Sequence, residues 1–440
     1  MYIMKKILLL TVMASLSIVL FAQTDTTKKE VAKKGWGFGA VPAIAYDSDI
    51  GFKYGGLVNF YDYGDGTIYP NYKHSIYMEW SHTTKGSGIA EISYDSKYLI
   101  PGVRFTGDID YLTEQALDFY GFNGYNSYFN SDYSDNTKTD YKSRMYYRLQ
   151  RSLLRMTGDF QGKLAGNKLM WVAGIHFYGV NISDVNRDKY YTDLPKVDTA
   201  SSLFSKYKYY KLIPDNQYNG GNVGLVKFGL VYDTRDNEPN PMTGMWTEVF
   251  LQVAPSFMGS PNTYTQLVIA HRQYFTLKKE VLNFAYRVAY QTKLSGDIPF
   301  YMLPLVYYSN RPTTDGIGGA KTVRGIMRDR IVGDGMAYAN LEMRWKFYRH
   351  VFGKQNFYIA LAGFLDGGMV TQNYKFDLSH NPPPDLLKTI DYANETPHIC
   401  YGAGLHFVLN QNFIVTVDYG QTTNPQDGGS GLYINLNFLF

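Results

Sequence analysis

The chain has 440 residues, among them 41 Tyr, 26 Phe, 42 Gly and a single Cys, and its formal charge is +4. No run of about 20 apolar residues occurs beyond the first two dozen positions, which excludes membrane-spanning helices in the exported chain. Without Lys5 and Lys6 of the N-terminal segment the charge falls to +2, and this near balance argues against a nucleic-acid partner, whose phosphates favour a concentrated basic face.

The N-terminus predicts export. Lys5 and Lys6 are followed by the apolar stretch 7–21 and by the small residue Ala22, the pattern of a secretory signal peptide over residues 1–22. Residues 23–34 are polar and too few for a domain, so we expect a short periplasmic tether there. The lone Cys400 cannot form an internal disulfide.

From residue 35 onward, polar and apolar residues alternate over long stretches, which predicts β-strands because successive side chains of a strand point to opposite faces. Within 340–347 one face holds Asn340, Glu342, Arg344 and Lys346, and the other holds Leu341, Met343, Trp345 and Phe347. Residues 282–293 alternate in the same way, with Arg287 on the polar face. The last ten residues place Leu432, Ile434, Leu436, Phe438 and Phe440 on one apolar face.

Sixteen such segments can be counted. They lie near residues 35–45, 51–61, 73–84, 87–99, 103–112, 143–157, 168–181, 222–234, 244–256, 263–274, 279–294, 336–347, 355–367, 396–408, 412–420 and 431–440. Long strands with tyrosine-rich ends are typical of outer-membrane barrels, whereas strands of soluble sandwiches average about five or six residues. We therefore predict an all-β fold, a 16-stranded antiparallel transmembrane β-barrel over residues 35–440, in the bacterial outer membrane.

The connections between these segments indicate an orientation. The long ones all follow odd-numbered strands, and they are 113–142, 182–221, 295–335, 368–395 and 421–430. Barrels of this kind have short turns at the periplasmic end and long loops at the outer end. With both termini in the periplasm, the long connections are expected to be extracellular.

Three short motifs follow one another in the second half of the chain. The stretch YDTRDNEPNPMTG contains Asp233, Arg235, Asp236, Asn240, Pro241 and Gly244 and predicts a strand that runs into a braced turn. The stretch KTVRGIM, in the long connection 295–335, contains Val323, Arg324 and Gly325. The stretch FLDGG, in a predicted strand, contains Phe364, Asp366 and Gly368.

Together and in this order, the three motifs resemble those of the BamA/TamA superfamily of outer-membrane barrels (the bacterial surface antigen superfamily), which includes insertases and secretion transporters. The family pattern has an aromatic residue after Val-Arg-Gly, where this chain has Ile326. The terminal Phe440 matches the assembly signal of such barrels. The resemblance covers residues 222–440 well and the first half by strand count alone. It implies a long extracellular loop, carrying Arg324, that folds into the barrel lumen.

The strand pattern supports a partner for this arginine. Phe357, Ile359 and Leu361 form a lipid-facing row, which places Asp366 in the opposite row, inside the barrel. A cation inside the lumen is partly desolvated and costly without a counter-charge. We expect Arg324 and Asp366 to form a charge-assisted pair that latches the loop. The alternative is that residues 366–368 are a plain turn and that Arg324 is solvated.

The sequence contains neither of two motifs that are common in hydrolases. There is no Gly-x-Ser-x-Gly or His-Glu-x-x-His sequence, and the eight histidines are scattered. His176 and His406 fall within predicted strands, where a hydrogen-bonded wall residue is the simpler interpretation. We expect no catalytic site, no metal site and no cofactor.

The front end of the chain departs from the family pattern. Relatives carry periplasmic POTRA modules that capture client chains, whereas only residues 23–34 precede the predicted barrel. The prediction is a POTRA-less barrel that assists insertion or translocation of proteins or lipids at the outer membrane. Its expected partners are outer-membrane lipids and lipopolysaccharide, with a separate periplasmic or surface protein as a candidate. The alternative is a passive plugged barrel or a narrow pore.

The resemblance also implies a mechanism, the parting of the seam between the first and last strands. Gly35, Gly37 and Gly39 lie on one face of the first strand, and each glycine inside a strand weakens it by about 0.5–1 kcal/mol. With Phe438 and Phe440 of the last strand they define the predicted lateral seam. The alternative is that the three glycines make room for the inserted loop.

Overall fold

The computed structural model describes residues 33–47, 51–69, 71–186, 201–352, 355–409, 413–436 and 438–440. The predicted signal peptide, 1–22, and all but the last two residues of the predicted tether, 23–34, lie outside these residues. No helix in the described part of the chain is long and apolar enough to cross a membrane.

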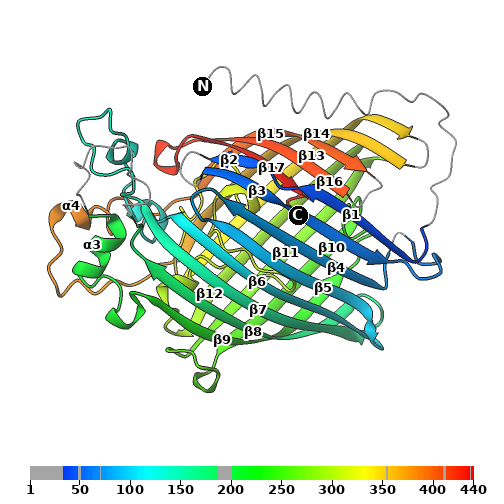
Figure 1. The fold of residues 1–440 in the computed structure, drawn as a ribbon, viewed down its shortest axis with the longest axis horizontal. Coiled ribbons are helices and arrows are strands. Elements are labelled where there is room, and N and C mark those ends of the chain that lie inside the picture. Colours follow the sequence, from blue (N-terminus) through cyan, green and yellow to red (C-terminus); the bar gives the residue numbers. More distant parts are fainter. Residues whose placement is uncertain are drawn as a thin grey trace.

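The molecule is built on one antiparallel sheet that curves into a barrel (Figure 1). Its strands are β1 (Trp36–Pro42), β2 (Ala45–Asp47), β3 (Gly51–Asp62), β4 (His74–Thr83), β5 (Gly88–Ile100), β6 (Val103–Asp118), β7 (Arg148–Ala165), β8 (Leu169–Ser183), β9 (Gly220–Asp233), β10 (Gly244–Ala254), β11 (Tyr264–Lys278), β12 (Leu282–Gly296), β13 (Gly335–Phe352), β14 (Gln355–Gln372), β15 (His398–Leu409), β16 (Phe413–Thr422) and β17 (Ser430–Leu436). Because β1 and β2 both pair with β3, they are two parts of one strand. The prediction of an all-β barrel with sixteen antiparallel strands is confirmed.

Short helical segments lie in the connections. They are α3 (Leu203–Tyr209), α4 (Pro384–Leu387) and 3-10 turns at Gly124–Asn126, Ser131–Ser134, Asp215–Gln217, Ser256–Met258, Phe300–Met302, Gly319–Lys321 and Pro425–Asp427. α3 and α4 lie at the end of the barrel where the long connections gather (Figure 1).

Several strand ends differ from the prediction. The first strand is interrupted after Pro42, which has no N–H to donate to a ladder. β6 continues to Asp118, beyond the predicted end at 112, and β14 continues to Gln372, beyond 367. Outside the lipid-facing band the outward residues need not be apolar, so the alternation fades although the strands still pair.

The two faces of the wall are as different as the alternation predicts. On β13, Met343 and Trp345 are 41% and 49% exposed, whereas Glu342 and Arg344 are 1% and 2% exposed. Outward apolar residues face the lipid, and inward charged residues are covered by other parts of the chain.

The C-terminus departs from the prediction. β17 ends before the last residues, and Phe440 is buried in the interior instead of continuing the outward row of Ile434. The guanidinium of Arg344 lies 4.1 Å from the ring centroid of Phe438 and donates a hydrogen bond of 3.1 Å to the main-chain oxygen of Phe440. The expectation that Phe438 and Phe440 share one face with Leu432 and Ile434 is therefore wrong, because an inward cation binds their rings and the end of the chain.

Long and short connections alternate between the two ends of the barrel, as expected. The long ones link β6 to β7, β8 to β9, β12 to β13, β14 to β15 and β16 to β17, and each follows an odd-numbered strand of the sixteen.

At the end of the barrel where the long connections lie, an aromatic cluster packs over the opening. Phe119 makes edge-to-face contacts with Phe204 and Tyr207, and Phe122 packs on Phe300. Segments far apart in the sequence thus form one apolar cover.

Candidate functional site

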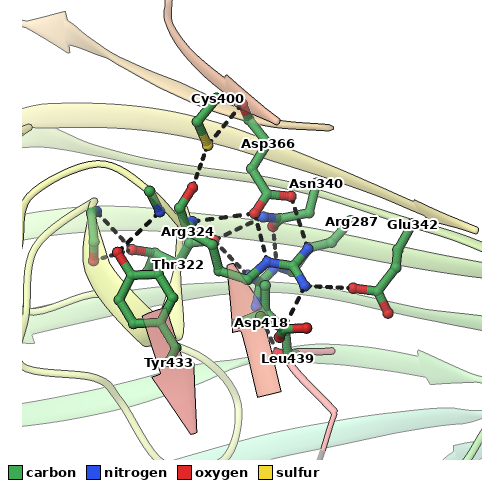
Figure 2. A network of polar contacts seen from close by, with 12 residues as sticks. Arg287, Thr322, Arg324, Asn340, Glu342, Asp366, Cys400, Asp418, Tyr433 and Leu439 are labelled. Carbon is green, nitrogen blue, oxygen red and sulfur yellow. Dashed lines mark hydrogen bonds and ion pairs between the residues drawn. The ribbon is translucent and has the colours of Figure 1, made fainter. Parts of the chain in front are cut away.

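A buried ion-pair cluster joins the β12–β13 connection, residues 297–334, to the barrel wall (Figure 2). Nε and Nη2 of Arg324 donate to Oδ2 and Oδ1 of Asp366 at 2.8 and 3.1 Å, which is a bidentate pair. The backbone N–H of Arg324 donates to the same carboxylate at 3.2 Å. Arg324 is 0% and Asp366 1% exposed, so water barely screens the pair.

Three further side chains complete the surroundings of Arg324. Its Nη1 donates to Glu342 of β13 at 2.7 Å and to Asp418 of β16 at 3.3 Å. The ring of Phe364 lies 3.5 Å from the guanidinium carbon, so the cation also stacks on an aromatic face. Glu342 in turn accepts from Nε of Arg344 at 2.6 Å. The loop cation is therefore held by three strands of the wall.

Sequence reasoning missed part of this cluster. It placed Glu342 and Arg344 on the polar face of their strand without a specific partner, and it did not single out Asp418. The alternation on β16 places Asp418 in the inward row with Ile414 and Thr416, and this signal could have identified it. Alternation gives the face of a residue but not its height on the wall, so several inward carboxylates were equally plausible partners.

The backbone of the Val-Arg-Gly step is fixed as closely as the arginine side chain. Val323 is fully buried. Gly325 has a φ of 99°, a conformation that side chains rarely adopt, and its N–H donates to the Tyr433 hydroxyl at 3.0 Å. The thiol of Cys400 donates to the carbonyl of Arg324. On β14, a Cβ at Gly368 would lie 2.8 Å from a methyl of Ile317, so the loop packs directly on the wall there.

The same connection is tied to the opposite wall. Arg328 forms an ion pair with Glu114 of β6. Arg155 of β7 donates to the carbonyl of Pro312 at 2.9 Å. Residues 297–334 therefore contact inward-facing groups of β6, β7, β13, β14 and β16, and they span the interior of the barrel.

At the end with the long connections, Arg330 joins three of them. Its guanidinium donates to the carbonyls of Gly124, Ser127 and Gln426 at 3.0, 2.9 and 2.8 Å. Oδ1 of Asp427 lies 3.7 Å from Nε of Arg330. Hydrogen bonds thus join residues 297–334, which we call the plug, to the apolar cover formed by the other long connections.

The residues of the strand-and-turn motif shape the β9–β10 connection. Nε and Nη2 of Arg235 donate to Asp233 at 3.0 and 2.7 Å, and Oδ1 of Asp236 accepts three backbone N–H groups of the turn. Pro241 is buried. Gly244 has a φ of 92°, and a Cβ there would lie 2.2 Å from a backbone oxygen, so only glycine fits. The motif braces a turn, as its spacing indicates.

This connection, which we call the strap (residues 234–243), crosses the end of the barrel where the short connections lie. Glu238 pairs with Arg104 of β6 at 3.1 Å. The carbonyl of Met242 accepts from Nδ2 of Asn283 on β12 at 2.8 Å, and Nζ of Lys346 on β13 lies 3.1 Å from the Met242 sulfur. Because β6 and β12 are separated by five strands, the strap spans the opening.

The seam between the two ends of the sheet has no ladder. Ladders run from β1 through to β17, but within the described residues none joins β17 to β1 or β2. Gly37 and Gly39 lie in β1, whereas Gly35 precedes it, in a turn where its N–H donates to Gly64 at 2.7 Å. The expectation that all three glycines belong to the strand is corrected at Gly35, whose φ of 62° belongs to a turn.

An all-antiparallel wall curved into a barrel, apolar outside and charged inside, is the architecture of an outer-membrane β-barrel. The model of the Omp85 superfamily domain matches residues 85–438, and the chain belongs to this superfamily. The protein therefore resides in the bacterial outer membrane, and its family agrees with the expectation that it is not an enzyme.

Solved structures have a similar fold. BamA from Haemophilus ducreyi lacking POTRA domains 1–3 has a TM-score of 0.51 and 16% identity, over 92% of this chain and 70% of that chain. CdiB from Escherichia coli has a TM-score of 0.52 and 9% identity, over 91% of this chain and 61% of that chain. No curated protein matches the chain.

Proposed function

We propose that this barrel assists the insertion or translocation of proteins or lipids at the outer membrane, and that it acts by parting the seam beside β1. The observation that carries the proposal is the missing ladder between β17 and the first strand among the described residues. Every backbone group exposed to hydrocarbon without a partner costs several kcal/mol. An unpaired strand edge in a membrane therefore favours either closure or an incoming strand.

The composition of β1 supports this proposal over the simpler interpretation of its glycines. A Cβ on Gly39 would meet no atom within 4 Å. A small residue at this position is therefore not required for packing against the plug. Glycine there does lower the strand's resistance to opening, since it adds no cross-strand side-chain contact.

β17, the other strand at the seam, is as short as β1. β17 pairs with β16 over seven residues, from Ser430 to Leu436. Its terminal tripeptide is held inside by Arg344 and Arg287, both of which place a guanidinium near the Phe440 ring. These three residues therefore do not extend β17 along β1.

The plug argues against passage straight through the centre. Arg324 and Arg328 tie residues 297–334 to opposite walls, and the strap lies across the other end. A route along the wall needs only the seam to open, whereas a central route needs all of these contacts to break.

The same contacts favour a second candidate, a passive plugged barrel. A loop held by Asp366, Glu342 and Asp418 at once is built to stay in place. Such a barrel would stabilise the membrane or admit only small solutes.

The two functions can be distinguished in vesicles. The purified barrel, reconstituted in lipid vesicles, is mixed with a urea-unfolded outer-membrane barrel as client, and folded client is measured by protease protection. We expect faster client insertion than in empty vesicles, together with negligible dye leakage. No acceleration of insertion would leave the passive barrel, and steady dye leakage would identify a pore.

A further inference from the structure

The outer wall carries an apolar hollow beside the seam. It has a volume of about 840 Å³ and is lined by residues of β1, β3, β4, β5 and β6. Its exposed side chains belong to the outward rows: Trp80, Ile92, Ile109 and Tyr111 are 55%, 53%, 59% and 49% exposed, while the intervening Asp110 is 1% exposed. The hollow therefore opens to the lipid and not to the lumen.

The hollow results from small residues placed between large ones. In the cross-strand register, Gly56 faces Trp80, Trp80 faces Ala90, and Ala90 faces Tyr111. A Cβ on Gly56 would meet only a backbone oxygen of Val41, at 3.6 Å. Neither packing nor backbone conformation requires glycine here, so the missing side chain simply leaves space on the membrane side.

Lipid surrounds this wall, so the solvent that fills the hollow is hydrocarbon. A flat apolar wall holds no particular lipid, since lipid tails are as apolar as the wall itself and association in a membrane depends on van der Waals packing. A chain lying in a trough touches protein on several sides and gains more of these contacts. The volume falls within the range of about 300–1,000 Å³ that is usual for small-molecule sites.

The position of the hollow indicates the leaflet. Ala90 is the third residue of β5, close to the 84–87 connection, which lies at the same end as the long connections. Trp80 and Tyr111 share its cross-strand row, and such aromatic residues are enriched at the membrane–water interface. A chain would therefore enter from the headgroups at that end and lie along the row of Met78 and Ile92.

We propose that this hollow is a binding site for one acyl chain of lipopolysaccharide. With the long connections outside the cell, as expected from their lengths, the hollow lies in the outer leaflet, whose lipid is lipopolysaccharide. The site rests on the barrel's place in the outer membrane and on that orientation, and it is independent of insertase activity. A chain held there lies against β1, the strand with the unladdered edge.

The test compares filled and unfilled hollows. Ala90→Leu and, separately, Gly56→Leu fill the trough, and Ala403→Leu adds the same side chain at an exposed outward position of β15 outside it. Each folded protein, checked by its heat-dependent gel shift, is loaded with equal amounts of hexa-acylated lipid A and palmitoyl-oleoyl phosphatidylethanolamine. Retained lipid is then counted by native mass spectrometry.

We expect the unaltered barrel and Ala403→Leu to retain one lipid A, and both filling variants to lose at least about fivefold in retention, which corresponds to ~1 kcal/mol. Equal retention by Ala90→Leu, Gly56→Leu and Ala403→Leu would overturn the site. Preferential retention of the phospholipid would overturn the assignment to lipopolysaccharide. The client-insertion assay does not enter this comparison, so failure of one proposal is distinct from failure of the other.

Discussion

Gly420 of β16 lies directly against the peptide bond between Arg324 and Gly325. A Cβ on Gly420 would come within 2.8 Å of the carbonyl carbon and oxygen of Arg324 and of the nitrogen of Gly325. Because Gly420 has no side chain, the main chain of the loop contacts the main chain of the wall at this point. Contact of main chain with main chain, and not only the ion pair, therefore determines where the plug sits.

This relationship makes Gly420 a sensitive position. Gly420→Ala should displace the loop and lower the free energy of unfolding by about 1–3 kcal/mol, the usual cost of overpacking. Thermal and denaturant unfolding in detergent would measure it. Gly363→Ala is the matched control, because a Cβ at Gly363 on β14 meets nothing within 4 Å. Equal stability of the two variants would show that the loop does not rest on Gly420.

The Arg324 cluster should be strongly coupled. Asp366→Asn leaves Arg324 with Glu342 and Asp418 and should cost about 1–3 kcal/mol. Arg324→Met removes the cation shared by three buried carboxylates, of which Glu342 keeps Arg344 as a partner, and should cost more, about 3–5 kcal/mol. The double variant should cost less than the sum of the two, as measured in a double-mutant cycle from unfolding curves.

A surface pair supplies the control for this cycle. Glu280→Gln breaks an exposed pair with Arg349 and should change stability by less than about 1 kcal/mol. Strictly additive losses for Arg324 and Asp366 would contradict the latch.

The strap should be released by loss of Glu238. Burial raises the pKa of this carboxyl, but Arg104 and Lys97 outweigh burial and hold its pKa well below the ordinary value. A lowered pKa in the folded state means that the stabilisation is present above the unfolded value of about 4.3 and is lost as pH falls towards the folded value. Hydrogen exchange of the strap, corrected for intrinsic rates, should be constant from pH 8 to 5.

Glu238→Gln should accelerate that exchange by about fivefold, the effect of one partly exposed pair of ~1 kcal/mol. Glu280→Gln, which removes a carboxylate paired with Arg349 and not with a residue of the strap, should leave it unchanged. A strap that exchanges as slowly in Glu238→Gln as in the unaltered chain would be held by its Met242 contacts alone.

The orientation can be tested on whole cells. Because the long connections are expected outside, protease added to intact cells should cut within 184–219 or 373–397, as detected by mass spectrometry of the fragments. The short connection at 279–281 should be cut only after the outer membrane is broken. Cleavage at 279–281 in intact cells would reverse the orientation.

Strand alternation accounts for how much of this fold could be predicted from sequence. On β13 the inward residues from Asn340 to Lys346 are charged or polar and the outward residues from Leu341 to Phe347 are apolar, because one face meets the plug and the other meets lipid. This pattern gives strand number, wall faces and connection lengths. It fails where lipid no longer selects the outward residue, as beyond residue 112 of β6.

The C-terminal tripeptide shows a different limit. Phe438 and Phe440 continue the apolar period of β17, yet both turn inward to Arg344. Local pattern cannot anticipate this, since the competing cation comes from a strand almost a hundred residues earlier. The same limit explains why Asp366 could be suggested as a partner of Arg324 while Asp418 was missed.

Parting of the seam is the central claim, and a reversible lock tests it most directly. In a Cys400→Ser background, which keeps a donor for the Arg324 carbonyl, cysteines replace Phe38 of β1 and Ile434 of β17. The matched control joins Phe38 to Phe60, its ladder partner on β3, and therefore locks a pair of strands that should never separate. Client insertion into vesicles is measured before oxidation, after oxidation and after reduction. The account predicts that only the seam-locked barrel loses insertion when oxidised and regains it when reduced. Full activity of the oxidised seam lock would contradict lateral opening and leave the passive barrel as the function.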